Sequence, residues 1–193
     1  MGSSRQFGLT VMQILAGVGA AQAGSFDSIA TTTLSTAAAS VTFSSIPANY
    51  KHLQIRFIAR TNQTGDVTGS YLTWTFNSDT AANYAWHVIK GDGSIVNSSA
   101  IVDSAVTYSE RITSSFQSSN VFGAGCIDIL DYANTNKFKT HRTLAAWDSN
   151  GSGQIAFNSG LWRSTSAINE ITIYPAVNDF VQYSSFALYG IKG

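Results

Sequence analysis

The three histidines are the side chains best suited to general-base or metal chemistry, because imidazole titrates near neutral pH. His52, His87 and His141 are far apart in the chain, and none belongs to an H-x-H or H-E-x-x-H arrangement. We therefore expect strand-end histidines with ordinary hydrogen bonds and no metal site. The single cysteine, Cys126, excludes an internal disulfide and any Cys-based metal cluster. It lies in an apolar run, so we expect a buried, inert thiol.

The carboxylates are the next candidates for acid–base chemistry. Asp128 and Asp131 are three residues apart, and on an extended strand this separation directs them to opposite faces, unlike a glycosidase pair. Asp128 lies between isoleucines, so we expect it to pair with an arginine or to cap loop amides. Glu110 and Glu170 are isolated in the sequence.

Residues 148–153 begin like a calcium-binding loop, with Asp148, Asn150 and two glycines. The acidic residue that closes an EF-hand loop is absent, and the glycines suit a tight turn equally well, so we favour a hairpin turn. The chain also contains no Gly-x-Ser-x-Gly elbow and no phosphate-binding glycine-rich loop. These patterns predict a protein that is not an enzyme and that needs no cofactor or metal.

Aromatic residues could instead bind a ligand by stacking on sugar rings, as in lectins. Tyr84, Trp86 and Trp162 are the candidates for such a surface site, and Trp74 and Trp147 also fall near expected strand ends. The alternative, which we favour for each tryptophan, is packing in the core.

The composition fits an extracellular or virion β-protein. Hydrophobic residues make up 44% of the 193 residues, which is enough for a packed core, whereas charged residues make up only 11% against about 25% in ordinary soluble proteins. Eleven basic and eleven acidic residues cancel, and no run of Lys or Arg appears. A nucleic-acid partner is therefore not expected, because phosphate binding needs clustered positive charge.

The first twenty-five residues differ from the rest and are expected to form a separate N-terminal segment, either an arm or a short helix. We favour an arm that docks on another protein through Val11, Met12, Ile14 and Leu15. Two alternatives stay open: a secretory signal cleaved after the Ala-Gln-Ala at 21–23, and a part of the domain's own core. The apolar stretch is too short and too interrupted for a membrane span.

Residues 26–193 are dominated by period-two alternation of apolar and polar residues, interrupted by turns rich in Asn, Asp, Gly and Ser. With no sustained helical period after residue 35, this predicts one all-β domain, an antiparallel jelly-roll-like β-sandwich. Residues 96–119 are expected to hold an edge strand and a long loop. The expected strands cover residues 40–44, 52–60, 71–76, 84–89, 121–130, 143–147, 154–157, 168–174 and 185–191.

Several short sequence segments of the chain resemble those of a group of small virion structural proteins of tailed bacteriophages, including phages of cyanobacteria and marine bacteria. The His-Leu-Gln-Ile-Arg phrase and the C-terminal ending are the most specific. The N-terminal segment lies outside the resemblance. The matching phrases are residues 26–33, 41–47, 52–56, 76–80, 127–132, 159–163 and 182–193.

This resemblance implies a structural component of the phage particle surface, with other virion proteins, such as the major capsid protein or tail components, as partners. A capsid decoration, cement or head-fibre protein is favoured, since the chain has no long stalk. A tail-fibre or tail-spike protein that binds a host surface glycan is the alternative, and a secreted carbohydrate-binding module follows only if the N-terminal segment is cleaved. Homo-oligomers, such as trimers, fit both phage interpretations.

Overall fold

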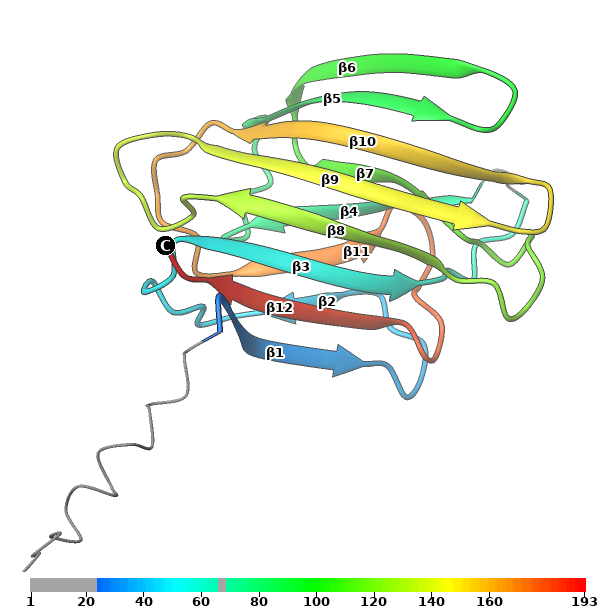
Figure 1. Cartoon of the computed structure of the whole chain (residues 1–193), viewed down its shortest axis with the longest axis horizontal. Helices are drawn as coiled ribbons and strands as arrows, with labels where there is room; N and C mark the ends of the chain where they lie inside the picture. The colour runs from blue at the N-terminus through cyan, green and yellow to red at the C-terminus, as the bar shows by residue number, and fades with distance from the viewer. Residues whose placement is uncertain (1–23, 66–68) are drawn as a thin grey trace, which may run out of the picture.

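A computed structural model describes residues 24–65 and 69–193, and these residues form two antiparallel β-sheets packed face to face. Figure 1 shows the larger sheet in front of the smaller one. Within the described residues there is no helix that is long and apolar enough to cross a membrane. The strands are β1 (Phe26–Thr33), β2 (Val41–Phe43), β3 (His52–Ala59), β4 (Ser70–Phe76), β5 (Tyr84–Gly91), β6 (Val96–Ser104), β7 (Thr107–Ile112), β8 (Gly123–Leu130), β9 (Lys139–Asp148), β10 (Gly153–Trp162), β11 (Ile171–Pro175) and β12 (Ser185–Ile191).

The order of the strands confirms the jelly-roll prediction. The larger sheet has the order β1-β12-β3-β8-β9-β10-β5-β6, and the smaller has the order β2-β11-β4-β7. Eight of these strands, β1-β12-β3-β8 facing β2-β11-β4-β7, alternate between the sheets as the two Greek keys of a jelly roll do. The hairpins β5–β6 and β9–β10 are additions that extend the larger sheet beyond β8.

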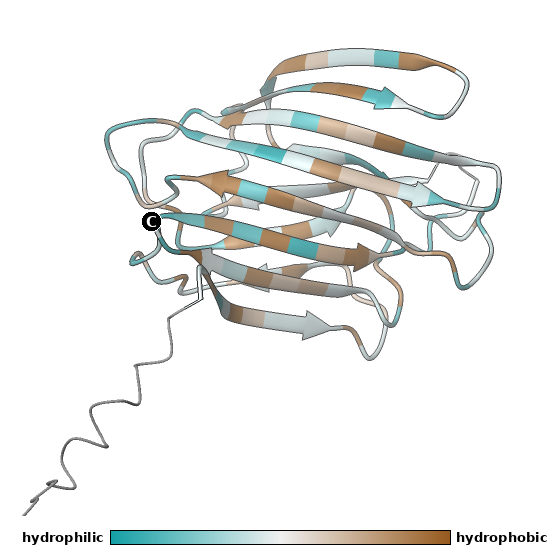
Figure 2. Cartoon of the chain, in the orientation of Figure 1, coloured by the Kyte–Doolittle hydropathy of each residue, from teal (hydrophilic) through white to brown (hydrophobic). Residues whose placement is uncertain are grey.

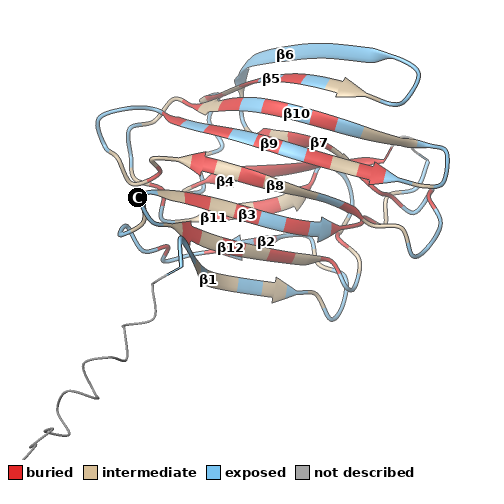
Figure 3. Ribbon diagram, viewed as in Figure 1, coloured by how far each residue is buried: buried red, intermediate tan, exposed pale blue. Residues whose placement is uncertain are grey.

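The core lies between the two sheets and follows from the alternation in the sequence. Leu53, Ile55 and Phe57 of β3 point inward and are at most 2% exposed, while Arg56 and Ile58 between them are exposed. The smaller sheet contributes Leu72, Trp74 and Phe76 from β4, each fully buried. Burying such side chains is the main driving force for folding. Figure 3 shows the resulting alternation of buried and exposed residues along β3 and β8 to β10.

The inner face of the added strands carries a buried polar layer that period-two hydrophobicity does not reveal. β7 of the smaller sheet contacts β9, β10 and β5 and so covers this layer. A buried polar group is tolerated where it is hydrogen-bonded. Across the sheets, His141 Nε2 lies 2.8 Å from Thr107 Oγ1, and Asn158 Nδ2 donates to the carbonyl of Tyr108 at 3.4 Å. The polar residues here are each at most 1% exposed: Lys139, His141, Thr143 and Asn158 on the added strands, and Thr107 and Ser109 on the covering strand β7.

The structure contains two strands that the sequence pattern did not predict, β1 and β7. The observed β9 and β10 also extend beyond the predicted strands at both ends. β1 is rich in Ser and Thr and forms one edge of the larger sheet, while β7 carries polar side chains that face the layer just described. The predicted edge strand within residues 96–119 is confirmed as β6, which among the described residues pairs only with β5. Figure 3 shows β6 exposed along its length.

Candidate interaction surfaces

The three histidines lie in three unrelated environments. His52 begins β3, and its Nδ1 accepts a hydrogen bond from the amide of Asp131 at 2.9 Å, as expected for a strand-end histidine. His87 lies within β5, where it is exposed, and His141 lies within β9, where it is fully buried. The expectation of a strand-end position is therefore wrong for these two.

His141 is a neutral core residue. Its Nε2 lies 2.8 Å from Thr107 Oγ1, and its ring packs edge-on against Trp74 and Phe76. Desolvation by burial lowers its pKa from 6.5 to about 3, because the charged imidazolium would lose its hydration without gaining a counter-charge. With this pKa the ring is uncharged at neutral pH, and its enclosure excludes contact with a substrate.

Three of the candidate carboxylates, Asp128, Glu110 and Asp131, form ion pairs, whereas Glu170 accepts a hydrogen bond from Ser78. Arg142 Nε donates to Asp128 Oδ2 at 2.9 Å, which confirms the predicted arginine partner, and Gln54 Nε2 donates to the other oxygen at 2.7 Å. Glu110, isolated in sequence, is 1% exposed and pairs with Lys90 Nζ at 3.1 Å. Within the described residues, no group of three or more His, Cys, Asp or Glu side chains could hold a metal ion.

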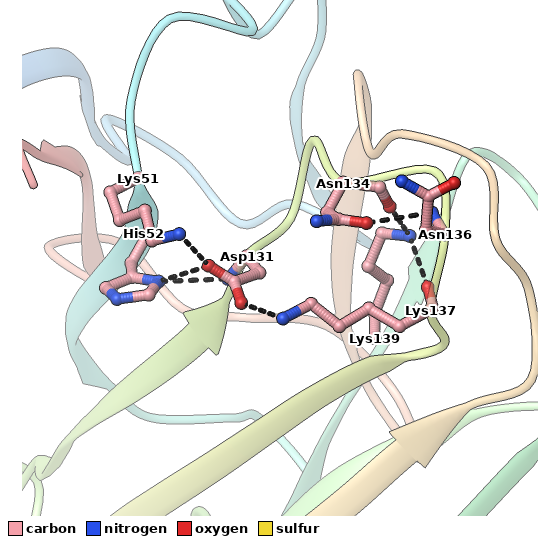
Figure 4. Close-up of polar contacts among 7 residues, drawn as sticks. All are labelled: Lys51, His52, Asp131, Asn134, Asn136, Lys137 and Lys139. Atoms are coloured by element: carbon pink, nitrogen blue, oxygen red, sulfur yellow. Dashed lines mark hydrogen bonds and ion pairs between the residues drawn. The ribbon is translucent and has the colours of Figure 1, made fainter.

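Asp131 is the centre of a charged cluster in the β8–β9 connection (Figure 4). Its carboxylate pairs with Lys51 at 2.9 Å and with Lys137. The hydrogen bonds from Lys137 and then Lys51 lower its pKa from 3.8 to about 2. The buried Lys139 donates from Nζ to the carbonyl oxygens of Asn134, Lys137 and Thr165 at 2.6–3.1 Å. The cluster thus holds the loop in place.

The aromatic residues proposed for surface binding are in the core. Tyr84, Trp86 and Trp162 are 0%, 8% and 2% exposed, so the expectation that they stack on a surface ligand is wrong and the core-packing alternative is right. Trp162 Nε1 donates to Asp79 Oδ2 at 2.7 Å, and Trp86 packs edge-on against Tyr108 with ring centroids 4.2 Å apart. The other proposed contact residues, Val11, Met12, Ile14 and Leu15, lie outside the described residues.

The residues at 148–153 form the predicted hairpin turn between β9 and β10. Asn150 and Gly151 both have positive φ, 51° and 105°, and the amide of Ser149 donates to the carbonyl of Ser152 at 2.7 Å. This is the two-residue Asn-Gly turn that fits the twist of a hairpin. Asp148 Oδ1 accepts the amide of Asn150 at 2.8 Å, so this carboxylate supports the turn.

The outer face of the larger sheet carries a continuous apolar surface, which we call the outer stripe. It consists of two adjacent rows of outward-pointing side chains that run across the paired strands β3, β8, β9, β10 and β5. Figure 2 shows apolar positions on several of these neighbouring strands. The outer stripe comprises Ile58, Ala124, Ala146 and Ile155 in one row, and Cys126, Leu144, Phe157 and Ile89 in the other.

The large side chains of the outer stripe are far more exposed than core residues. Ile58, Ile89, Leu144, Ile155 and Phe157 are 46–57% exposed. Cys126 is half-buried within the stripe, between Arg56 and Leu144, so the expectation of a buried thiol is wrong. A monomer rarely exposes so continuous an apolar surface unless something binds there. The outer stripe is therefore the candidate functional surface.

Charged side chains border the outer stripe on its two long sides. Along β9 the outward residues are Arg142, Leu144, Ala146 and Asp148 in turn, so Arg142, which pairs with Asp128, lies at one border and Asp148 lies at the other. Two shallow hollows, about 480 and 280 Å³, lie between the ridges of side chains. The first is floored in part by Ala124 and Ala146 and the second is flanked by Leu144, Ile155 and Phe157.

A second candidate surface is a groove of about 550 Å³ where the loops after β5, β7 and β9 meet. Trp147 and Gln154 line it, and the described residues provide no hydrogen-bond partner for Trp147 Nε1 or Gln154 Oε1. Both atoms are shielded from solvent, so a ligand could reach them only after the side chains around them move. Phe116, which is 60% exposed, adds an aromatic face to this groove.

Comparisons of the chain with protein-family models, with curated proteins and with solved structures give no match. The surfaces just described therefore remain the guide to function. The position of the outer stripe was not predicted from the sequence. A local sign of it was present, because residues 144–147 and 155–157 have no polar residue on either face of the strand.

Proposed function

We propose that this chain is a non-enzymatic structural component of a tailed-phage virion, most simply a capsid decoration, cement or head-fibre protein docked through its N-terminal segment. The observation that carries the proposal is the outer stripe, an apolar assembly surface on a jelly-roll domain. Jelly rolls are a common architecture of viral capsid proteins. The phrases that resemble phage virion proteins support the same function.

The nature of the charged groups also supports a structural role. Asp128, Glu110 and Asp131 each pair with a basic side chain, and His141 is enclosed in the core. These groups hold strands and loops together, and in this arrangement they have no evident part in acid–base chemistry.

Quantitative mass spectrometry of purified phage particles that contain the chain tests the proposal. A decoration or cement protein is present in copies that cover the shell, whereas a tail protein is present in only a few copies. Deleting residues 1–24 is expected to abolish attachment while the isolated domain stays folded. Absence of the chain from the mature particle would refute the virion proposal, and normal attachment of the truncated chain would refute docking through the N-terminal segment.

The groove at the loop ends favours a second candidate function, recognition of a neutral host surface glycan by a tail-fibre or tail-spike protein. An indole N–H, an amide oxygen and the exposed ring of Phe116 are a combination that suits a sugar's hydroxyl groups and its apolar face. Titration with host polysaccharide should change the fluorescence of Trp147. Phe116→Ala should weaken that response, and Tyr183→Ala, which changes an exposed aromatic residue outside the groove, should not.

A further inference from the structure

We propose that the outer stripe binds a second copy of this chain, face to face and with the β9 strands antiparallel. The inference rests on the proposed function, because both proposals assign the outer stripe to contact with another protein. It adds the identity of the partner and the relative orientation of the two copies.

The extent of the outer stripe fits a protein interface. Five large side chains that are about half exposed, together with the small residues between them, present several hundred Å² of mostly apolar surface. A stable interface of standard size buries about 800 Å² on each partner, with an apolar centre and a polar rim. The outer stripe supplies such a centre, and the polar residues along its borders supply the rim.

Arg142 pairs with Asp128 of its own chain, and the antiparallel orientation adds Asp148 of the second copy as a further partner. A twofold axis that lies in the interface and crosses the strands between the two rows places Arg142 of one copy opposite Asp148 of the other, at both ends of β9. An axis parallel to the strands would instead place arginine near arginine. Because the chain has no net charge, no long-range repulsion opposes the contact.

On β9 and β5 the same orientation matches a large side chain with a small one, whereas on β10 Phe157 faces Ile155 of the second copy. Leu144 of one copy faces Ala146 of the second copy, and Ile89 faces Gly91 of the second copy. The hollow of about 480 Å³ beside Ala124 and Ala146 is the place that Leu144 of the second copy would fill. Interdigitation of this kind is how the inner faces of stacked sheets pack.

Sedimentation velocity of the full chain over a range of concentrations tests the proposal. The wild-type chain should sediment as a dimer, and Leu144→Lys or Phe157→Lys should raise the dissociation constant at least tenfold. Val177→Lys is the matched control, since Val177 is 49% exposed but lies outside the outer stripe, and it should stay dimeric. A monomeric wild-type chain, or an oligomer that the stripe variants leave intact, overturns the proposal.

Two further measurements test the orientation of the dimer, and test its formation without any substitution that could cause misfolding. Arg142→Glu and Asp148→Lys should each weaken the dimer, and the double variant should recover affinity; a double variant no better than the single ones overturns the antiparallel orientation. In the wild-type chain, modification of Cys126 by a thiol reagent should slow as concentration rises, because dimerisation covers it. A rate independent of concentration overturns the proposal without any substitution. Neither result depends on whether the chain occurs in virions.

Discussion

Acidification should destabilise this protein well above the pH at which carboxylates titrate, because of one buried histidine. His141 has a pKa of about 3 in the folded chain and an ordinary value of 6.5 when exposed. Between these values the unfolded chain binds one proton more than the folded chain, so stability falls as pH decreases. The loss approaches about 1.4 kcal/mol per pH unit, and it amounts to about 2 kcal/mol between pH 6.5 and 4.5.

Urea unfolding followed by tryptophan fluorescence at pH 6.5, 5.5 and 4.5 measures this effect, with an unchanged m-value as the check on two-state behaviour. The window avoids Asp131, whose pKa is lowered to about 2, so that its contribution is lost mainly between pH 4 and pH 2. His141→Gln should remove most of the slope, while His87→Gln, an exposed control, should retain it. A wild-type stability that is constant from pH 6.5 to 4.5 would contradict the burial argument, and so would a His141→Gln variant with the wild-type slope.

Three other substitutions test the packing and the charged clusters. Gly160→Ala should lower the free energy of unfolding, measured with urea, by about 3 kcal/mol, because a Cβ there would lie 2.0 Å from the enclosed His141 ring. A variant as stable as the wild type would show that the ring can move. Arg60→Met should lower the free energy of unfolding by about 3 kcal/mol, because the buried guanidinium donates to three carbonyls of the 113–122 loop. It should also expose this loop to limited proteolysis, and an unchanged cleavage pattern would contradict this. Asp131→Asn should lower the melting temperature at pH 7 by an amount that corresponds to about 1 kcal/mol. The effect should be much smaller near pH 2, where about half of the wild-type carboxylates are protonated. An equal effect at both pH values would refute the ion-pair explanation.

The sequence was informative where one face of a strand is apolar and the other polar. His52–Ala59 alternates in this way, and the predicted strand agrees with β3 to within one residue. β9 begins four residues earlier than predicted because its inward side chains there are Lys139 and His141. Polar side chains can face a sheet interior when the opposite sheet supplies partners, and no local pattern reveals such partners. The strand β7, which contributes Thr107 to this contact, escaped prediction for the same reason.

The outer stripe depends on register, which the sequence does not specify. Leu144, Phe157 and Ile89 become neighbours only because β9, β10 and β5 pair in one alignment, and a shift of one residue would direct all three inward. The burial of the tryptophans is likewise not specified by the local sequence. A tryptophan near a strand end could face solvent or the core, and only the packing against Asp79 and Tyr108 places Trp162 and Trp86 inside.

The pairing of the first and last strands has a consequence for protein engineering. Phe26 of β1 lies opposite Ile191 of β12, and the amide of Lys192 donates to the carbonyl of Ser25 at 3.0 Å, so the two ends of the sandwich leave it side by side (Figure 1). A short linker could therefore join them in a circular permutant that opens at the β5–β6 turn, where Gly93 lies in an exposed loop. The same geometry would allow the whole sandwich to be inserted into a surface loop of a host protein without separating the loop's two ends.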